Sequence, residues 1–155
     1  MTPDQLIEPW KSFFAEIDAA LSQEVSLHCL GGFVAKILFD LPRETADVDV
    51  LPIASNHEID SVIATAVEGS TLHQKYGVYL QVVALAPIPA EYESRLTEMF
   101  PGRFKYLRLF ALDPYDLALS KIERNSQRDR DDVKHLACMV PFDLEILRRR
   151  FEDEL

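Results

Sequence analysis

The stretch "CLGGFVAKILFDLPRETADVDVLP", residues 29 to 52, decides how this chain folds. It joins an apolar run that ends at the pair Gly31-Gly32 to a second run that carries Asp47 and Asp49. In a β-strand, residues two apart face the same way, so the two carboxylates project side by side while the neighbouring valines face the core. Adjacent carboxylates repel each other unless a cation lies between them or one binds a proton. The pair therefore indicates either a cation site or a solvent-facing edge strand that carries charge against aggregation.

The same stretch offers a phosphate site beside the acidic pair. The two glycines lie between a predicted strand and a predicted helix, where bare backbone N–H groups and the helix dipole can hold phosphate. Mg²⁺ prefers one or two carboxylates and completes its coordination with waters and substrate phosphates. The sequence thus predicts that a phosphate site and a magnesium or manganese site lie together.

Composition predicts one globular domain over residues 1–155, since the chain is 48% hydrophobic and 27% charged. No apolar run approaches the roughly 20 residues of a membrane span, and the start lacks the features of a signal peptide, so no membrane partner is expected. Cys29 and Cys138 lie in apolar settings typical of reduced thiols in a cytoplasmic protein. The net charge of -10 argues against indiscriminate nucleic-acid binding but leaves a local basic patch open.

Hydrophobic periodicity predicts strands mixed with helices. Strands are expected at residues 25–30, 46–53, 78–85 and 104–112. Helices are expected at residues 3–21 (or only from Pro9, which can start the helix), 33–41, 56–70, 92–100, 113–125, 128–139 and 142–155. Asn56 and Asp113 are the expected N-caps of two of these helices. About four strands followed by a helical tail indicate an α+β (mixed α/β) fold, with a core of about residues 22–112 and C-terminal helices at 113–155.

The C-terminal part carries a second group of charged residues. Lys121 is expected in a helix, at the margin of a core face that Leu117 and Ile122 form, or else as a solvated helix residue. The segment 128–132 alternates arginine and aspartate, and an ordinary capped helix start also explains its early acids, because they offset the macrodipole. The arginine run 148–150 is either a solvated helix face or a contact for an RNA backbone.

Two glycines followed after a gap by Asp-hydrophobic-Asp resemble the signature of the polymerase-beta-like minimal nucleotidyltransferase fold. The surrounding "LPRETADVDV" is similar to the AbiEii/MenT-type nucleotidyltransferase toxins and their uncharacterised relatives, in which an arginine and a small hydroxyl residue precede the acids, as Arg43 and Thr45 do here. The tail "DLALSKIERNSQRDRDDVKHL" is similar to the later motifs of that group. The tail residues that match are Lys121, Arg128, Asp129, Asp132, Val133 and Leu136. The resemblance covers about residues 25–137.

The resemblance implies a metal-dependent enzyme that moves a nucleoside monophosphate from a nucleoside triphosphate to an acceptor, either RNA (a tRNA 3′ end in some members) or protein. It implies Mg²⁺ or Mn²⁺ as the cofactor, and the toxin half of a toxin–antitoxin pair with a cognate antitoxin as partner. The implied catalytic residues are Asp47, Asp49, Lys121 and Asp132, of which the first two bind the metal. The implied nucleotide-binding residues are Gly31, Gly32, Arg43, Thr45 and Arg128.

Two positions depart from the family pattern. Many members of the wider fold supply a third carboxylate from a later strand, where this chain offers Gln81, so Asp129 or Asp132 would have to complete the metal site. The second small residue of the glycine motif, often serine in the toxins, is Gly32. The alternative function is therefore a catalytically silent binding or interaction protein of the same fold, which the Asp-Val-Asp motif and Lys121 oppose.

Overall fold

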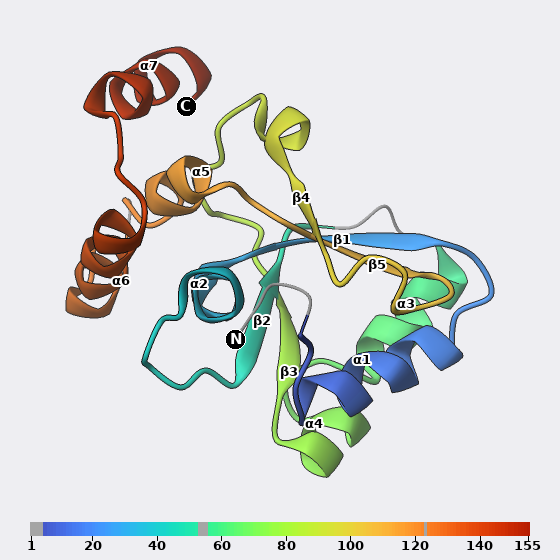
Figure 1. Ribbon diagram of the computed structural model, residues 1–155. Coiled ribbons are helices and arrows are strands. Elements are labelled where there is room, and N and C mark those ends of the chain that lie inside the picture. The colour runs from blue at the N-terminus through green and yellow to red at the C-terminus, as the bar shows by residue number, and fades with distance from the viewer. Residues whose placement is uncertain (1–4, 53–55, 123) are drawn as a thin grey trace.

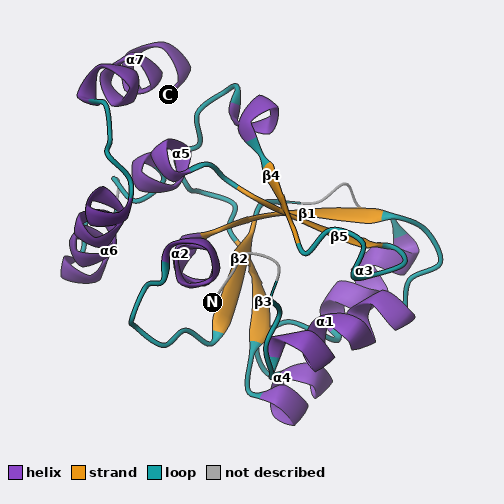
Figure 2. Cartoon of the chain, viewed as in Figure 1, coloured by secondary structure: helices purple, strands orange, loops and turns teal. Residues whose placement is uncertain are grey.

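The computed structural model describes residues 5–52, 56–122 and 124–155 (Figures 1 and 2). Within these residues the strands are β1 (Val25–Leu30), β2 (Asp47–Val50), β3 (Tyr79–Val82), β4 (Thr97–Met99) and β5 (Leu107–Ala111). The helices are α1 (Trp10–Ala19), α2 (Gly31–Phe39), α3 (His57–Ala64), α4 (Thr71–Tyr76), the 3₁₀ helix η1 (Tyr92–Arg95), α5 (Pro114–Leu119), α6 (Gln127–Met139) and α7 (Leu144–Glu154). The fold is α+β, as the sequence predicts.

The strands form one mixed sheet in the order β3-β2-β1-β5-β4 within the described residues. β1 lies antiparallel to β2 and parallel to β5, while β3 runs parallel to β2 and β4 antiparallel to β5. Figure 1 shows α5, α6 and α7 together on one side of the molecule, away from α1, α3 and α4. In the part of the chain that the structure describes, no helix has both the length and the apolar character that crossing a bilayer requires.

The four expected strands are present, and the structure adds a fifth. The helical prediction for residues 92–100 is wrong after Arg95, because residues 97–99 form β4 and pair with β5. Met99 is buried in the core as a result. Local propensity is a weak guide at an edge strand, since the pairing partner and the buried face decide the conformation. Residues 3–4, 53 and 123 of the predicted elements lie outside the described residues.

The helices α2 and α3 differ from their predicted bounds, α2 at its start and α3 at its end. α2 begins at Gly31, so the glycine pair opens the helix instead of forming a turn before it. Asn56 caps α3 as predicted, by accepting a hydrogen bond of 2.9 Å from the backbone N–H of Ile59. The predicted helix 56–70 nevertheless ends early, because Val67 forms a bridge to Leu80 of β3. A separate short helix, α4, follows at Thr71–Tyr76.

The hydrophobic core lies between one face of the sheet, α1 and α2. The ring centroids of Trp10 in α1 and Phe33 in α2 are 4.9 Å apart in an edge-to-face contact, which joins the two helices. The strand residues buried on this face include Val25, Leu27, Cys29, Val48, Val50, Leu107, Leu109 and Ala111. Since side chains alternate along β2, the burial of its valines places its two aspartates on the opposite face of the sheet.

A buried ion network attaches α7 to the rest of the chain. No residue of α7, all of which the structure describes, is buried in the core. Asp116 of α5 is fully buried, and Arg95 of η1 donates to its two carboxylate oxygens at 2.9 and 3.0 Å. Arg150 of α7 reaches Asp113 and Asp116 at 2.9 Å, and Glu154 accepts from Arg95 at 2.8 Å. Asp113 also caps α5 as predicted, by accepting from the N–H of Asp116 at 2.8 Å.

The arginine run 148–150 is not an open basic patch. Arg150 belongs to the buried network, and Arg148 pairs with Glu145 and Glu152 on its own helix. Two of the three positive charges that would contact an RNA backbone are therefore already paired with carboxylates.

Asp116→Ala is expected to lower the free energy of unfolding by about 3 kcal/mol, because Arg95 and Arg150 lose a fully buried carboxylate. Urea denaturation measures the loss. Glu152→Ala is the control, since it removes a carboxylate from an exposed pair and should change stability by less than about 0.5 kcal/mol. Equal effects in the two variants would show that the buried network does not hold α7.

Candidate active site

The antiparallel pairing of β1 with β2 brings the start of α2 against the acidic pair. Leu30, the last residue of β1, lies opposite Asp49. The next residue, Gly31, has a φ of +77° and touches the Asp49 side chain so closely that an added β-carbon would collide with Oδ2 and lie 3.1 Å from Cγ. Only glycine suits position 31, because the backbone is left-handed there and no side chain fits beside Asp49. Gly32 is less constrained, because its φ is not positive and an added β-carbon would lie 3.0 Å from the end of the Arg43 side chain instead of colliding with a carboxylate.

The two carboxylates of β2 have different surroundings. Asp47 accepts a hydrogen bond of 3.1 Å from the hydroxyl of Thr45, which holds it in place. Asp49 is more deeply enclosed, and its buried Oδ1 receives no hydrogen bond from any residue that the structure describes. Burial, together with the neighbouring charge of Asp47, raises the pKa of Asp49 to about 6, against the opposing charges of Lys121 and Arg124. Asp49 thus has one buried carboxylate oxygen, Oδ1, that lacks a hydrogen-bond partner among the described residues.

These residues fit a divalent cation. An unpartnered buried oxygen beside a second carboxylate is the donor set that Mg²⁺ or Mn²⁺ uses when waters and phosphates supply its other ligands. Within the described residues, no group of three or more histidine, cysteine or acidic side chains is placed to hold a metal ion. Gln81 of β3 lies beside Asp49 in the strand register. A neutral amide therefore occupies the position at which the sequence analysis expected a third carboxylate in the wider fold.

Lys121 comes to the site from the turn after α5. The helix ends at Leu119, so the prediction that Lys121 lies within a continuing helix is wrong. Its side chain is buried, with Nζ 3.1 Å from Asp132 Oδ2 and 3.9 Å from Asp129 Oδ1. Leu117 is buried as predicted, but Ile122, predicted to face the core, is 47% exposed. Lys121 is therefore not a solvated surface residue. We expect its removal to lower the stability of the protein, because Asp132 would lose a buried partner.

Asp132 joins Lys121 to Arg43 over a long stretch of sequence. Its carboxylate accepts from Arg43 Nη2 at 2.6 Å as well as from Lys121, and it is 2% exposed. It lies behind the cations and not on the lining of the cleft. Asp132 thus orients the side chains of Arg43 and Lys121 toward the cleft that Gly31 and Asp49 also line.

Asp129 likewise orients Arg124, a residue that the sequence analysis did not identify. It closes the capping box of α6 with Ser126, which confirms the capped-helix interpretation, and its two oxygens also accept from Arg124 at 2.7 and 2.5 Å. The Arg124 guanidinium holds the pKa of Asp129 well below its usual range. Arg124 carries no motif of its own, but an arginine shortly before an N-terminal acid of a helix is the signal that could have indicated it.

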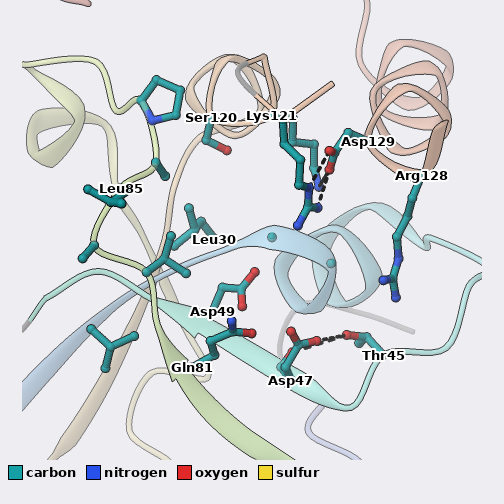
Figure 3. Close-up of a pocket in the computed structure, with 18 of the residues that line it drawn as sticks. Leu30, Thr45, Asp47, Asp49, Gln81, Leu85, Ser120, Lys121, Arg128 and Asp129 are labelled. Atoms are coloured by element: carbon teal, nitrogen blue, oxygen red, sulfur yellow. Dashed lines mark hydrogen bonds and ion pairs between the residues drawn. The ribbon is translucent and has the colours of Figure 1, made fainter. Parts of the chain in front are cut away.

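These residues surround one cleft with a volume of about 510 Å³. Figure 3 shows Asp47, Asp49 and Gln81 on the sheet, facing Lys121 and Arg128 across the cleft. Every predicted site residue except Asp132 lines it, namely Gly31, Gly32, Arg43, Thr45, Asp47, Asp49, Lys121 and Arg128, together with the unpredicted Arg124 and Ser120. The structure thus brings paired acids, a glycine helix start and several cations together, although their individual roles remain predictions.

One protein family matches almost the whole chain. Its model covers residues 12–155 and is described as "Nucleotidyltransferase of unknown function (DUF6036)". No curated protein and no solved structure matches the chain. The matched range includes both the acidic pair and the cations of the C-terminal part.

Gly31→Ala should destabilise the protein more than Gly69→Ala does. Both glycines have a positive φ, of +77° and +80°, so both variants carry the backbone strain of about 1–2 kcal/mol. Only at Gly31 does the new β-carbon also meet the Asp49 carboxylate, since nothing lies within 4 Å of the corresponding position at Gly69. Thermal melts of the two variants measure the difference, and equal losses would contradict the close contact with Asp49.

Asp49→Asn should raise the stability of the metal-free protein at pH 8 but not at pH 4. A carboxyl group whose folded pKa is raised from 3.8 to about 6 binds its proton more tightly in the folded state, so ionisation lowers stability as the pH rises through that interval. The gain in the variant should reach about 3 kcal/mol above pH 7, since each pKa unit corresponds to about 1.4 kcal/mol. Urea denaturation across this pH range measures it, with exposed Asp131→Asn as the control. A gain that does not depend on pH would contradict the raised pKa.

Proposed function

Since this chain belongs to that nucleotidyltransferase family, we propose that it moves a nucleoside monophosphate from a nucleoside triphosphate to an acceptor hydroxyl, with Mg²⁺ or Mn²⁺ as cofactor. The observation that carries the proposal is that the paired acids and the cations line the same cleft from opposite sides. Nucleotidyl transfer requires this combination, because one group of ligands must hold a metal while another binds phosphate charge.

Asp47 and Asp49 would hold the metal ion, with Thr45 orienting Asp47 through its hydroxyl. When bound, the ion neutralises charge on the α-phosphate and on the leaving pyrophosphate. The unpartnered Oδ1 of Asp49 supports this assignment, since a buried carboxylate oxygen without a hydrogen bond is otherwise costly.

The triphosphate would lie between the start of α2 and the cations of the C-terminal part. The first backbone N–H groups of α2 have no partner within the helix, so they can donate to phosphate oxygens. Lys121, Arg43 and Arg128 would balance the charge of the leaving pyrophosphate. Asp132 would be a positioning residue, because it holds Arg43 and Lys121 without lining the cleft itself.

A catalytically silent nucleotide-binding protein is the second candidate. The observation in its favour is the amide of Gln81 beside Asp49, where the wider fold often has a third carboxylate. Nucleotide and metal would then bind in the same cleft without transfer. Incubation with labelled nucleoside triphosphates separates the two candidates, because the silent protein would bind them and transfer no label.

A role as the toxin of a toxin–antitoxin pair is a finer proposal that rests on the resemblance of residues 25–137 to toxin sequences. It predicts that induced expression arrests growth, that Asp47→Asn relieves the arrest and that a cognate antitoxin blocks it. Growth without arrest would leave nucleotidyl transfer in place but remove the toxin role.

Mg²⁺ together with a nucleoside triphosphate should raise the melting temperature of the protein, and Asp47→Asn should abolish the increase. The substitution replaces one of the two charged protein ligands by a neutral amide, which binds Mg²⁺ much more weakly. Thermal melts with each of the four nucleoside triphosphates, with and without Mg²⁺, measure the effect. Asp131→Asn is the matched control, since Asp131 is an exposed aspartate of α6 away from the cleft. An equal increase in the Asp47→Asn variant would contradict the metal site.

Lys121→Ala should lower the rate of nucleotide transfer about a hundredfold or more, since it removes a positive charge from the site of the leaving pyrophosphate. The variant should also lose stability, because Asp132 and Asp129 lose a buried partner. Asp132→Asn is the control: it breaks the same ion pair but keeps the ammonium group. Because Asp132 positions Lys121 and Arg43, its variant should also lose some transfer, but less than Lys121→Ala does. If Lys121→Ala transfers label as fast as Asp132→Asn does, Lys121 has no catalytic role.

A further inference from the structure

The residue beside the acidic pair on the next strand is neutral. β3 runs parallel to β2, and Gln81 of β3 is in register with Asp49. Adjacent residues of paired strands face the same way, so Gln81 lies on the sheet face that carries Asp47 and Asp49. It also lines the cleft, and Figure 3 shows its amide next to the two carboxylates. Gln81 thus holds the place from which a third acid would reach the metal site, and it supplies no negative charge there.

No other acid that the structure describes replaces this third carboxylate. Asp129 lines the cleft, but both of its oxygens accept hydrogen bonds from Arg124, at 2.7 and 2.5 Å. Asp132 pairs with two other basic residues and does not line the cleft. Within the described ranges, no three histidine, cysteine or acidic side chains come close enough together to hold an ion. The carboxylates available to cations are therefore those of Asp47 and Asp49.

The charge of the cleft also limits how many cations it can hold. Three acids line it, together with four basic residues, namely Arg43, Lys121, Arg124 and Arg128. The charges of Lys121 and Arg124 act on Asp49 itself, since they oppose the rise in its pKa. Enzymes with two metal ions hold them about 3.5–4 Å apart, so a second divalent ion would add its charge directly beside these groups. A third carboxylate would offset that charge, whereas the amide of Gln81 does not.

We infer that the cleft binds one divalent ion with each nucleoside triphosphate, and that the neutral side chain of Gln81 prevents a second ion from binding. The inference rests on the proposed function and specifies the cofactor requirement of its metal site. In two-metal enzymes the ions stabilise the attacking and the leaving oxygens as a pair. A single ion on Asp47 and Asp49 would serve the triphosphate, so the acceptor hydroxyl would bind without an ion of its own.

The test uses Mn²⁺, because two Mn²⁺ ions in a two-metal site, about 3.5–4 Å apart, couple magnetically, whereas ions scattered over an acidic surface do not. The full chain is mixed with Mn²⁺ and a nucleoside triphosphate analogue in which a methylene group replaces the oxygen between the α- and β-phosphates. The analogue binds without being cleaved, so the complex persists during the measurement. Electron paramagnetic resonance should show uncoupled Mn²⁺ in this complex, and equilibrium dialysis should find one nucleotide-dependent ion per bound analogue.

Gln81→Glu should admit the second ion, because it places a carboxylate beside Asp49. We expect the number of nucleotide-dependent Mn²⁺ ions per bound analogue to rise from one to two, and the resonance signal of a coupled pair to appear. Gln81→Asp is a second variant of the same kind with a shorter side chain. Gln74→Glu is the matched control, since Gln74 is an exposed glutamine of α4 outside the cleft. It adds the same charge elsewhere and should keep the single ion.

Thermal melts without metal verify that each variant is folded. A coupled pair in the unaltered chain or in Gln74→Glu would overturn the inference, and so would a single ion in both folded Gln81 variants. If neither Gln81 variant folds, the unaltered chain decides between one ion and two. None of these results removes the proposed function, because metal and nucleotide still bind together. By contrast, an unaltered chain that binds no Mn²⁺ in a nucleotide-dependent manner contradicts the proposed function and the inference together.

Discussion

The close packing of Gly31 against the carboxylate of Asp49 is the contact on which the rest of the site depends. It exists because β1 and β2 are antiparallel, so that the end of one strand meets the acids of the other. The helix that starts at this point directs its free N–H groups to the same place as the carboxylates. The candidate phosphate site and the candidate cation site are thus separated by a single residue, Gly31. Only glycine tolerates both its left-handed conformation and its contact with Asp49.

The C-terminal helices complete the site by an arrangement of buried charges. Asp132 and Asp129 each hold cations that also face the cleft, and both aspartates are almost fully buried. Buried ion pairs add little net stability, because desolvation offsets most of their attraction. Their value here lies in orientation, since flexible side chains such as Lys121 and Arg43 are fixed before a substrate arrives. This explains why residues so distant in sequence contribute to a single cleft.

The two sides of the cleft differ in the kind of ligand they can hold. The side formed by the turn after α5 and by α6 is rich in charge, and the side formed by residues 82–87 has none. A nucleoside triphosphate is likewise asymmetric, with its charge concentrated at one end. A nucleoside triphosphate bound across the cleft would therefore place its phosphates on the charged side and its nucleoside on the apolar side.

The sequence by itself determined the parts that depend on neighbours along the chain. The alternation of β2 predicts that Asp47 and Asp49 share a face, and the caps at Asn56 and Asp113 start their helices as predicted, because each rests on contacts within a few residues. Only the tertiary structure decided that Thr97–Met99 forms β4, since the pairing with β5 outweighs a helical pattern.

Only the tertiary structure, likewise, could show which charges meet. The sequence offered Lys121, Asp129 and Asp132 as a motif and missed Arg124, and it could not indicate that Asp132 lies behind the cleft, bound to Arg43. Partners so far apart in the chain come together only when α6 packs against α2. Local sequence patterns encode contacts within a few residues, whereas burial and ion pairing between distant segments are properties of the assembled fold.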